Sequence, residues 1–266
     1  MLRIIAGLER PDQGQVQIGG QDVTARRPAD RSLSMVFQNY ALFPHLTVEE
    51  NILFGLRARG ASARHRAERL TYAADMLDLG PHLKKRPSML SGGQQQRVAL
   101  SRAIVGDRSI ILMDEPLSNL DAKLRADLRQ ELRTLQTRLG LTVLYVTHDQ
   151  LEALTMADRV VLLHDGRIAQ SSDPRSLFDR PQSLFAATFV GSPKMNILDA
   201  GLLAPQAANA LTGIKAGLRP EALRLGADGP LSVRLVGREF HGADTLLTLD
   251  LKGQELRARV KPRIAD

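Results

Sequence analysis

The distribution of apolar positions along the chain first predicts a parallel β-sheet. Two continuous apolar runs of strand length, residues 109–113 and 142–146, flank a helical pattern at residues 125–139. Strands that are apolar at every position are typical of a parallel sheet that helices cover on both faces. Residues 159–163 add a further strand, after which Asp165-Gly166 turns the chain back. The fold class is therefore α/β.

The N-terminal segment contains shorter elements. Residues 2–8 have the pattern of the last turns of an amphipathic helix. Residues 16–18 alternate as a strand does, and Gly19-Gly20 supplies the positive φ angles of a tight hairpin turn. Residues 33–37 form another strand.

A mostly helical stretch follows, from about residue 47 to residue 105. It begins with a capping box, in which the Thr47 hydroxyl and the Glu50 carboxylate satisfy free amides of the first helical turn. Residues 63–77 are rich in Ala, Leu and Arg at helical spacing. These patterns indicate several helices in succession.

The C-terminal part changes to short alternating strands after about residue 203. Residues 232–236 and 245–249 read as strands, and His241-Gly242 and Lys252-Gly253 read as turns. The pattern is typical of a small β-barrel or sandwich, and we expect residue 266 to fall before that domain closes.

The amino-acid composition argues against several classes of function for this chain. The chain has no cysteine, which excludes disulfides and cysteine nucleophiles. The net charge is +7, but arginines are interspersed with acids, as in residues 125–131, which is typical of solvated helix faces rather than of a nucleic-acid surface. No apolar run approaches the roughly 18 residues of a membrane span, so we expect any membrane role to depend on a partner.

Polar side chains follow three of the predicted strands. Gln38 follows the first, Asp114 and Glu115 the second, and His148 the third. Ligands of open α/β sheets collect beyond the carboxyl ends of the strands, so these groups should converge on one crevice. Each residue alone has a structural alternative, such as an ordinary loop or a hydrogen-bonded histidine. Their chemically matched roles favour a shared site.

These side chains suit phosphoryl transfer to water. Asp114 is placed to hold Mg²⁺ beside nucleotide phosphates, and Glu115 to orient and deprotonate the attacking water. His148 can hydrogen-bond a terminal phosphate oxygen, while Gln38 can bind the metal or the water. Such catalysis relies on positioning and electrostatics.

The most specific motif is residues 90–97, Leu-Ser-Gly-Gly-Gln-Gln-Gln-Arg. Ser91 and Gln94 form a capping box for the helix that follows. Gly92 and Gly93 remove side chains from its first turn, which exposes backbone N–H groups and the positive end of the helix dipole to an anion. The alternative is a helix that is merely well capped.

Together these motifs resemble those of ABC transporter nucleotide-binding subunits, over almost the whole chain. The resemblance is carried by residues 36–38 as the Q-loop, 90–94 as the LSGGQ signature, 111–116 as Walker B with its catalytic glutamate, 118–121 as the D-loop and 147–149 as the switch histidine. It implies a P-loop-ATPase-type sheet with its N-terminal strands missing and a helical subdomain at about 47–105. Residues 1–190 would be the nucleotide-binding domain, and 191–266 a partial OB-like, TOBE-type regulatory domain.

The resemblance also implies how the site works. In that family two subunits face head to tail, and ATP lies between the Walker A loop of one and the signature of the other, with Mg²⁺ as second cofactor. It assigns catalysis to Glu115 and His148, ATP binding to Gln38, Ser91, Gly92, Gly93, Gln94, Asp114 and Asp121, and metal binding to Gln38 and Asp114.

The implied partners are membrane proteins. A permease would insert a coupling helix near the Q-loop, a second ABC subunit would complete the dimer, and a periplasmic or extracellular solute-binding protein would act indirectly; no nucleic acid is expected. The subunit would lie peripherally on the cytoplasmic face of the bacterial inner membrane. Residues 189–196 and 217–221 resemble the maltose and sn-glycerol-3-phosphate branch. Importers of polyamine, iron or sulfate are alternatives.

One family motif is absent from residues 1–266: no G-x-x-x-x-G-K-[ST] sequence occurs, because none of the lysines follows a glycine. That loop is the main cradle for the β- and γ-phosphates. We therefore expect these residues alone neither to bind ATP tightly nor to hydrolyse it. Open alternatives are an inactive fragment, a non-catalytic partner of an intact ABC subunit, or a soluble ABC ATPase of DNA repair or translation.

Overall fold

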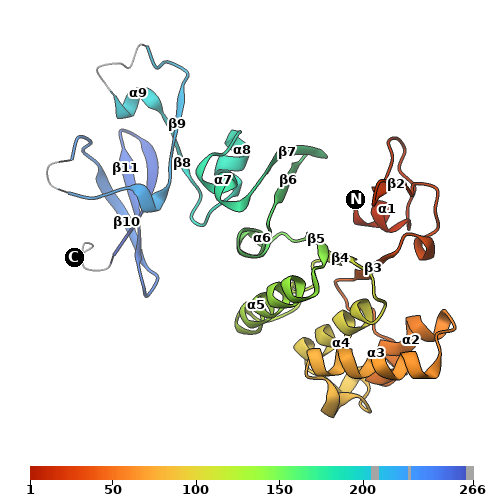
Figure 1. Ribbon diagram of the computed structural model, residues 1–266. Helices are drawn as coiled ribbons and strands as arrows, with labels where there is room; N and C mark the ends of the chain where they lie inside the picture. Colours follow the sequence, from red (N-terminus) through yellow and green to blue (C-terminus); the bar gives the residue numbers. More distant parts are fainter. Residues whose placement is uncertain (205–209, 227–228, 262–266) are drawn as a thin grey trace. The chain divides into compact units, whose positions relative to one another are not determined.

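The structure is a computed structural model that describes residues 1–204, 210–226 and 229–261 (Figure 1). The chain forms two compact units, residues 1–149 and residues 150–266. Within the described residues no helix combines the length and the apolar character that crossing a bilayer requires. The predicted domain boundary near residue 190 stays a prediction, and the expected end of the small domain at residue 266 lies outside the described residues.

The first unit contains the predicted parallel sheet. Its strands are β3 (Leu33–Val36), β4 (Ile110–Asp114) and β5 (Thr142–Val146), in the order β3-β4-β5. All three are predicted by the sequence as strands, β4 and β5 from the two continuous apolar runs. The α/β fold class is confirmed, with Leu112 of the central strand 1% exposed.

Helix α1 (Leu2–Ala6) covers one face of this sheet, where its apolar side packs against Leu112. Gly7 ends the helix with a φ of 78°, a left-handed conformation that glycine adopts without steric cost. The guanidinium of Arg31, which is 3% exposed, donates to the last carbonyls of the helix at 2.7 and 2.9 Å. These bonds satisfy groups that a helix end leaves free.

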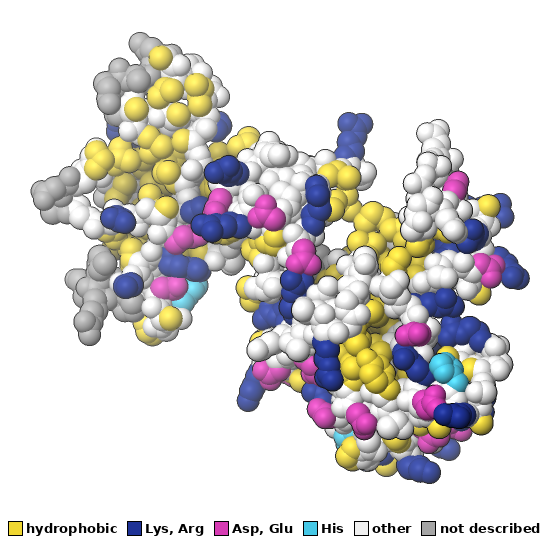
Figure 2. Space-filling model, viewed as in Figure 1, with side chains coloured by type: hydrophobic (Ala, Val, Ile, Leu, Met, Phe, Trp, Pro, Cys, Tyr) yellow, Lys and Arg dark blue, Asp and Glu magenta, His cyan; other side chains and the backbone are white. Residues whose placement is uncertain are grey.

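The helical stretch of the first unit consists of α2 (Val48–Ala58), α3 (Ala63–Met76) and α4 (Gly92–Ile104). The predicted capping box at the start of α2 is present, with the Thr47 amide donating to the Glu50 carboxylate at 2.8 Å. Figure 2 shows that Lys and Arg side chains are interspersed with Asp and Glu on the visible face. Short 3-10 turns lie at Pro28–Asp30, Gly80–His82 and Pro87–Met89.

Helix α4 lies against the opposite face of the sheet from α1. Ser34 alternates with the β3 residues that pack on α1, and its hydroxyl donates to the carbonyl of Ala103 in α4 at 3.0 Å. Helix α5 (Ala122–Leu139) begins earlier than predicted, because Asp121 caps it by accepting from an amide of the first turn at 3.0 Å.

The N-terminal hairpin is formed as predicted. Strands β1 (Gln17–Ile18) and β2 (Gln21–Asp22) pair antiparallel around Gly19 and Gly20, whose φ angles are 56° and 75°. Positive φ at both central positions is the geometry of the tight turns that match strand twist.

The second unit begins with α6 (Gln150–Met156), β6 (Val160–His164), β7 (Arg167–Ser172), α7 (Pro174–Asp179) and α8 (Leu184–Phe189). Strand β6 is the run predicted at residues 159–163. It pairs antiparallel with β7 in its own two-stranded sheet and does not extend the β3-β4-β5 sheet, because Asp165-Gly166 returns the chain directly.

The unit ends with β8 (Asn196–Asp199), α9 (Ala200–Leu203), β9 (Lys215–Leu218), a 3-10 turn (Pro220–Ala222), β10 (Arg234–Phe240), β11 (Thr245–Leu251) and β12 (Gln254–Val260). Strands β8 and β9 pair, and β10, β11 and β12 form a meander. Leu198 of one sheet packs with Leu249 and Leu251 of the other, so the two sheets share a core. The predicted small OB-like β domain is confirmed.

Arg219, which follows β9, links the two halves of this unit. Its guanidinium lies 4.0 Å from the ring centroid of Phe178 and donates to the carbonyls of Phe178, Ala187 and Val190. The bond to Phe178 is 2.7 Å long. The guanidinium thus caps the ends of both α7 and α8. Residues 217–221, which the resemblance to the maltose and sn-glycerol-3-phosphate branch identified, therefore have a structural role.

Candidate functional site

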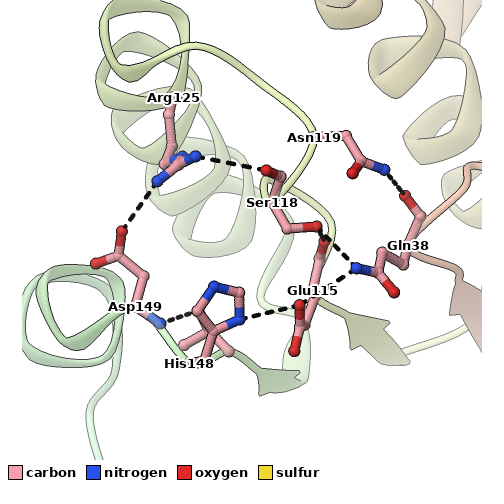
Figure 3. Close-up of polar contacts among 8 residues, drawn as sticks. Gln38, Glu115, Ser118, Asn119, Arg125, His148 and Asp149 are labelled. Carbon is pink, nitrogen blue, oxygen red and sulfur yellow. Dashed lines mark hydrogen bonds and ion pairs between the residues drawn. The ribbon is translucent and has the colours of Figure 1, made fainter.

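The parallel sheet brings together the polar residues that follow its strands (Figure 3). Asp114 is the last residue of β4 and Glu115 follows it; Gln38 and His148 lie shortly beyond β3 and β5. Because the three strands are parallel, their carboxyl ends share one edge. The predicted convergence at this edge is found.

The Glu115 carboxylate is the centre of this cluster. Its Oε2 lies 3.0 Å from His148 Nδ1 and accepts from Gln38 Nε2 at 3.3 Å. The Glu115 side chain is 27% exposed and that of His148 is 73% exposed, so the carboxylate is sheltered while the imidazole faces solvent. Two donors on a single oxygen hold the carboxylate in one orientation.

The backbone of Glu115 is strained. Its φ is 43°, in the left-handed region that a residue with a long side chain rarely adopts. The Glu115 amide donates to the Val146 carbonyl at 3.0 Å, which ties the residue to the end of β5. Strain of this kind persists only where the surroundings hold it, and it is common at functional sites.

Ser118 and Asn119, on the segment before α5, join the cluster. The Ser118 hydroxyl donates to the Glu115 carbonyl at 2.9 Å and accepts from Gln38 Nε2 at 3.3 Å. Asn119 Nδ2 donates to the Gln38 carbonyl at 3.0 Å. The sequence placed these two residues in a D-loop but assigned them no contact, because serine and asparagine are also ordinary turn residues.

The residues near Asp114 fit a magnesium ion whose other ligands are nucleotide phosphates and water. Mg²⁺ in such sites is held by one or two carboxylates plus phosphates and water, and not by a cage of protein ligands. Within the described residues no group of three or more His, Cys, Asp or Glu could hold a metal. Asp114 supplies a half-buried carboxylate at the strand end, and the Gln38 Oε1 takes no part in the hydrogen bonds above.

The helix that begins at Gly92 carries the predicted capping box. Gln94 Oε1 accepts from the Ser91 amide at 3.0 Å, and Ser91 Oγ accepts from the Gln94 amide at 3.4 Å. A Cβ on Gly92 would lie 3.0 Å from Leu120, and one on Gly93 3.0 Å from Leu124. The two glycines therefore also allow α4 to pack closely on the start of α5, and only Gly92 is exposed.

A histidine that the sequence did not single out supports this helix start. His82 Nε2 lies 3.3 Å from Gln94 Nε2, and His82 Nδ1 is buried without a partner among the described residues. The hydrogen bonds of residues 91–94 and those of Gln38, Glu115 and His148 form two separate groups within the described residues. Asp121 uses its carboxylate to cap α5.

Comparison with known proteins agrees with this geometry. A family model described as "ABC transporter" matches residues 1–118, and one described as "TOBE domain" matches residues 216–266. The sn-glycerol-3-phosphate import ATP-binding protein UgpC of Ruegeria pomeroyi is 48% identical over 96% of this chain and 76% of its own. The UgpC of Chromobacterium violaceum is 46% identical over 98% of this chain and 75% of its own.

A solved structure shows the same fold. The ATP-binding cassette MJ0796, in a dimeric post-hydrolysis state with ADP and Pi, superposes with a TM-score of 0.56. It is 34% identical and covers 65% of this chain and 79% of its own.

The parallel sheet, its strand-end cluster and the capped glycine helix define an ATP-binding subunit of the ABC class. With relatives close to half identical over three quarters of their length, the chain belongs to the ABC transporter family, as an importer-type ATP-binding protein with a TOBE domain.

Proposed function

We propose that this chain energises an ABC importer by binding and hydrolysing ATP in a head-to-tail dimer. The observation that supports the proposal most is the meeting of His148 and Gln38 on one oxygen of Glu115. That arrangement leaves Oε1 of Glu115 for a water molecule. A sheltered carboxylate that two neighbours hold in place is suited to orient a nucleophile.

The chain's own residues divide the chemistry. Glu115 orients the attacking water and takes its proton, while His148 holds a terminal phosphate oxygen beside it. Asp114 and the Gln38 amide oxygen would hold Mg²⁺, which would neutralise charge on the phosphates. The start of α4 offers backbone N–H groups and the helix dipole to the γ-phosphate on the opposite subunit, through residues Ser91, Gly92, Gly93 and Gln94. Asp121 contributes to ATP binding at the dimer interface.

The proposal for the solute and the partners rests on the similar proteins. Relatives named as sn-glycerol-3-phosphate import proteins support a sugar or sn-glycerol-3-phosphate importer, and polyamine, iron or sulfate are the alternatives. The chain would dock on a permease through a coupling helix at the cytoplasmic membrane face, with a solute-binding protein acting outside. Residues 1–190 would form the nucleotide-binding domain and residues 191–266 the regulatory one.

A second candidate, which the capped glycine helix start also supports, is a non-catalytic partner of an intact ABC subunit. The chain would then complete a composite site on an intact ABC subunit, by presenting Ser91 to Gln94 to nucleotide held there. Both candidates use the same helix start. They differ in whether Glu115 of this chain is needed for hydrolysis.

Two mixtures test the candidates. In the first, the 266-residue chain is mixed with an intact ABC subunit whose own signature serine is replaced by arginine, and ATP hydrolysis is measured. We expect the mixture to hydrolyse ATP and Ser91→Arg to abolish this, because arginine fills the phosphate position. Ser88→Arg, at an exposed serine nearby, is the matched control and should leave hydrolysis intact.

The outcomes separate the candidates. Catalysis by this chain is tested in a second mixture, with an intact subunit that keeps its signature but carries glutamine in place of its own catalytic glutamate. Loss of hydrolysis there with Glu115→Gln, but not with the exposed Glu68→Gln control, supports catalysis by this chain. Hydrolysis that depends on Ser91 in the first mixture, together with none in the second, supports the composite-site role alone. Both candidates are rejected if the two chains co-elute with ATP yet no hydrolysis depends on Ser91, or if they never associate.

A further inference from the structure

We propose that Arg125 is a positioning residue, which locks the segment before α5 to the segment that carries His148. The role rests on the proposed function, since both segments contact Glu115. Arg125 lies near the start of α5, and its guanidinium bonds to Asp149 and to two backbone carbonyls rather than to the Glu115 carboxylate or the His148 imidazole. Its effect on the site is therefore indirect.

The Arg125 guanidinium bridges the two segments (Figure 3). Its Nη2 donates to the Leu120 carbonyl at 3.0 Å and to the Ser118 carbonyl at 3.5 Å. Its Nη1 pairs with Asp149 Oδ2 at 3.3 Å. One planar group thus joins the chain before α5 to the residue directly after His148.

The positive charge of Arg125 lies at an unfavourable place in its own helix, so its contact with Asp149 requires an explanation. A cation near the N-terminus of a helix opposes the helix dipole, so Arg125 lies where its own helix disfavours it. The side chains of Arg125 and Asp149 are 28% and 25% exposed, so water screens their attraction less than on an open surface. Three acceptors around one planar guanidinium suit arginine, whose donors are fixed in a plane. They do not suit lysine, whose charge lies on a single ammonium group at the end of a flexible chain.

Both joined segments control Glu115. Ser118 donates to the Glu115 carbonyl, and His148 contacts its carboxylate. The Asp149 amide donates to Thr147 Oγ1 at 2.9 Å, which closes the turn around His148. Releasing Asp149 from Arg125 removes one of the contacts that hold this turn, and thereby loosens the placement of His148 on Glu115.

The first readout needs no nucleotide. The ¹H–¹³Cε1 resonance of the His148 imidazole, assigned with His148→Gln, reports its surroundings in the full chain. We expect Arg125→Met to move it toward the position of a free imidazole, and Arg125→Lys to move it part of the way. Asp149→Asn removes the same ion pair without altering α5, which guards against a folding defect in α5. Arg129→Met, one turn along α5, is the matched control.

The second readout is hydrolysis in the mixture with the intact subunit that keeps its signature but lacks its own catalytic glutamate, where hydrolysis depends on Glu115 of this chain. Arg125→Met should lower kcat about tenfold and leave KM within about twofold, because a positioning residue acts on the catalytic step and does not touch nucleotide. Combining Arg125→Met with Asp149→Asn should lower kcat by less than the product of the two separate effects, since the two residues share one ion pair.

The two failures are distinguishable. A His148 resonance that Arg125→Met and Asp149→Asn leave at its wild-type position, or that Arg129→Met moves equally, overturns the positioning role. A resonance that moves as expected in samples without any hydrolysis supports that role and rejects the proposed function.

Discussion

The side-chain amide of Gln94 is aimed at His82, with the two Nε2 atoms 3.3 Å apart. The orientation of this amide is fixed, because its Oε1 accepts from the Ser91 amide at 3.0 Å. The Gln94 Nε2 group must therefore donate, and His82 Nε2 must accept. We therefore expect the ring proton of His82 to lie on the buried Nδ1.

The tautomer of His82 can be measured directly. Long-range ¹H–¹⁵N spectra of the chain should show His82 with its proton on Nδ1, and the exposed His65 serves as the reference. His82→Gln, which keeps an acceptor, should preserve the Ser91 and Gln94 amide shifts. His82→Leu, which removes it, should move them toward those of an uncapped helix. A proton on Nε2 of His82 would contradict this contact.

Two glycine-to-alanine substitutions should differ in their effect on the free energy of unfolding. Gly55 lies in α2 with nothing within 4 Å of an added Cβ, so Gly55→Ala should stabilise the chain by about 1 kcal/mol through helix propensity. In Gly93→Ala the new Cβ meets Leu124 at 3.0 Å, and we expect no such gain. The measurement is the urea midpoint.

The same comparison has an internal control. Adding Leu124→Ala to Gly93→Ala removes the close neighbour, and the gain from propensity should return relative to Leu124→Ala alone. Equal gains in the free energy of unfolding from Gly55→Ala and Gly93→Ala would show that α4 and α5 do not pack closely where Gly93 meets Leu124.

Arg219 should matter for the stability of the second unit. Arg219→Met removes bonds to three carbonyls, so it should destabilise the unit by about 1–3 kcal/mol per carbonyl left buried and unpaired. Burial lowers the pKa of this guanidinium, which nonetheless stays charged. Chemical unfolding measures the effect, with the exposed Arg224→Met as control. Equal effects of the two changes would count against the anchoring role.

Glu50 should make the start of α2 sensitive to acid. The amide and hydroxyl of Thr47 donate to the Glu50 carboxylate and lower its pKa. A carboxylate whose pKa is lower in the folded than in the unfolded chain contributes stability above its ordinary pKa, and this is lost as pH falls through the folded value. The melting temperature of Glu50→Gln should therefore fall less steeply with acid than that of the wild type. Glu49→Gln, outside the capping box, should follow the wild type.

Local signals explain why much of the fold was predictable. The capping boxes of Thr47 and Ser91 depend on residues three positions apart, so the sequence contains both partners. The convergence of Gln38 and His148 on Glu115 was also predictable, because parallel strands end at the same edge.

Contacts between distant helix faces were not predictable in this way. The pairing of Arg125 with Asp149 and the packing of Gly93 on Leu124 depend on the rotation of α5 about its axis, which no local pattern specifies. Residues 159–163 have the composition of a sheet strand, yet a tight turn binds them to β7 first. Strand patterns identify strands but not their partners.

The left-handed backbone of Glu115 sets folding against activity at one position. Glycine adopts a φ of 43° freely, and an L-residue there costs roughly 1–2 kcal/mol. A Glu115→Gly chain would be relieved of this backbone strain while lacking the carboxylate that His148 and Gln38 hold. On the proposed function, the protein keeps a glutamate here at a cost in backbone energy that glycine would avoid.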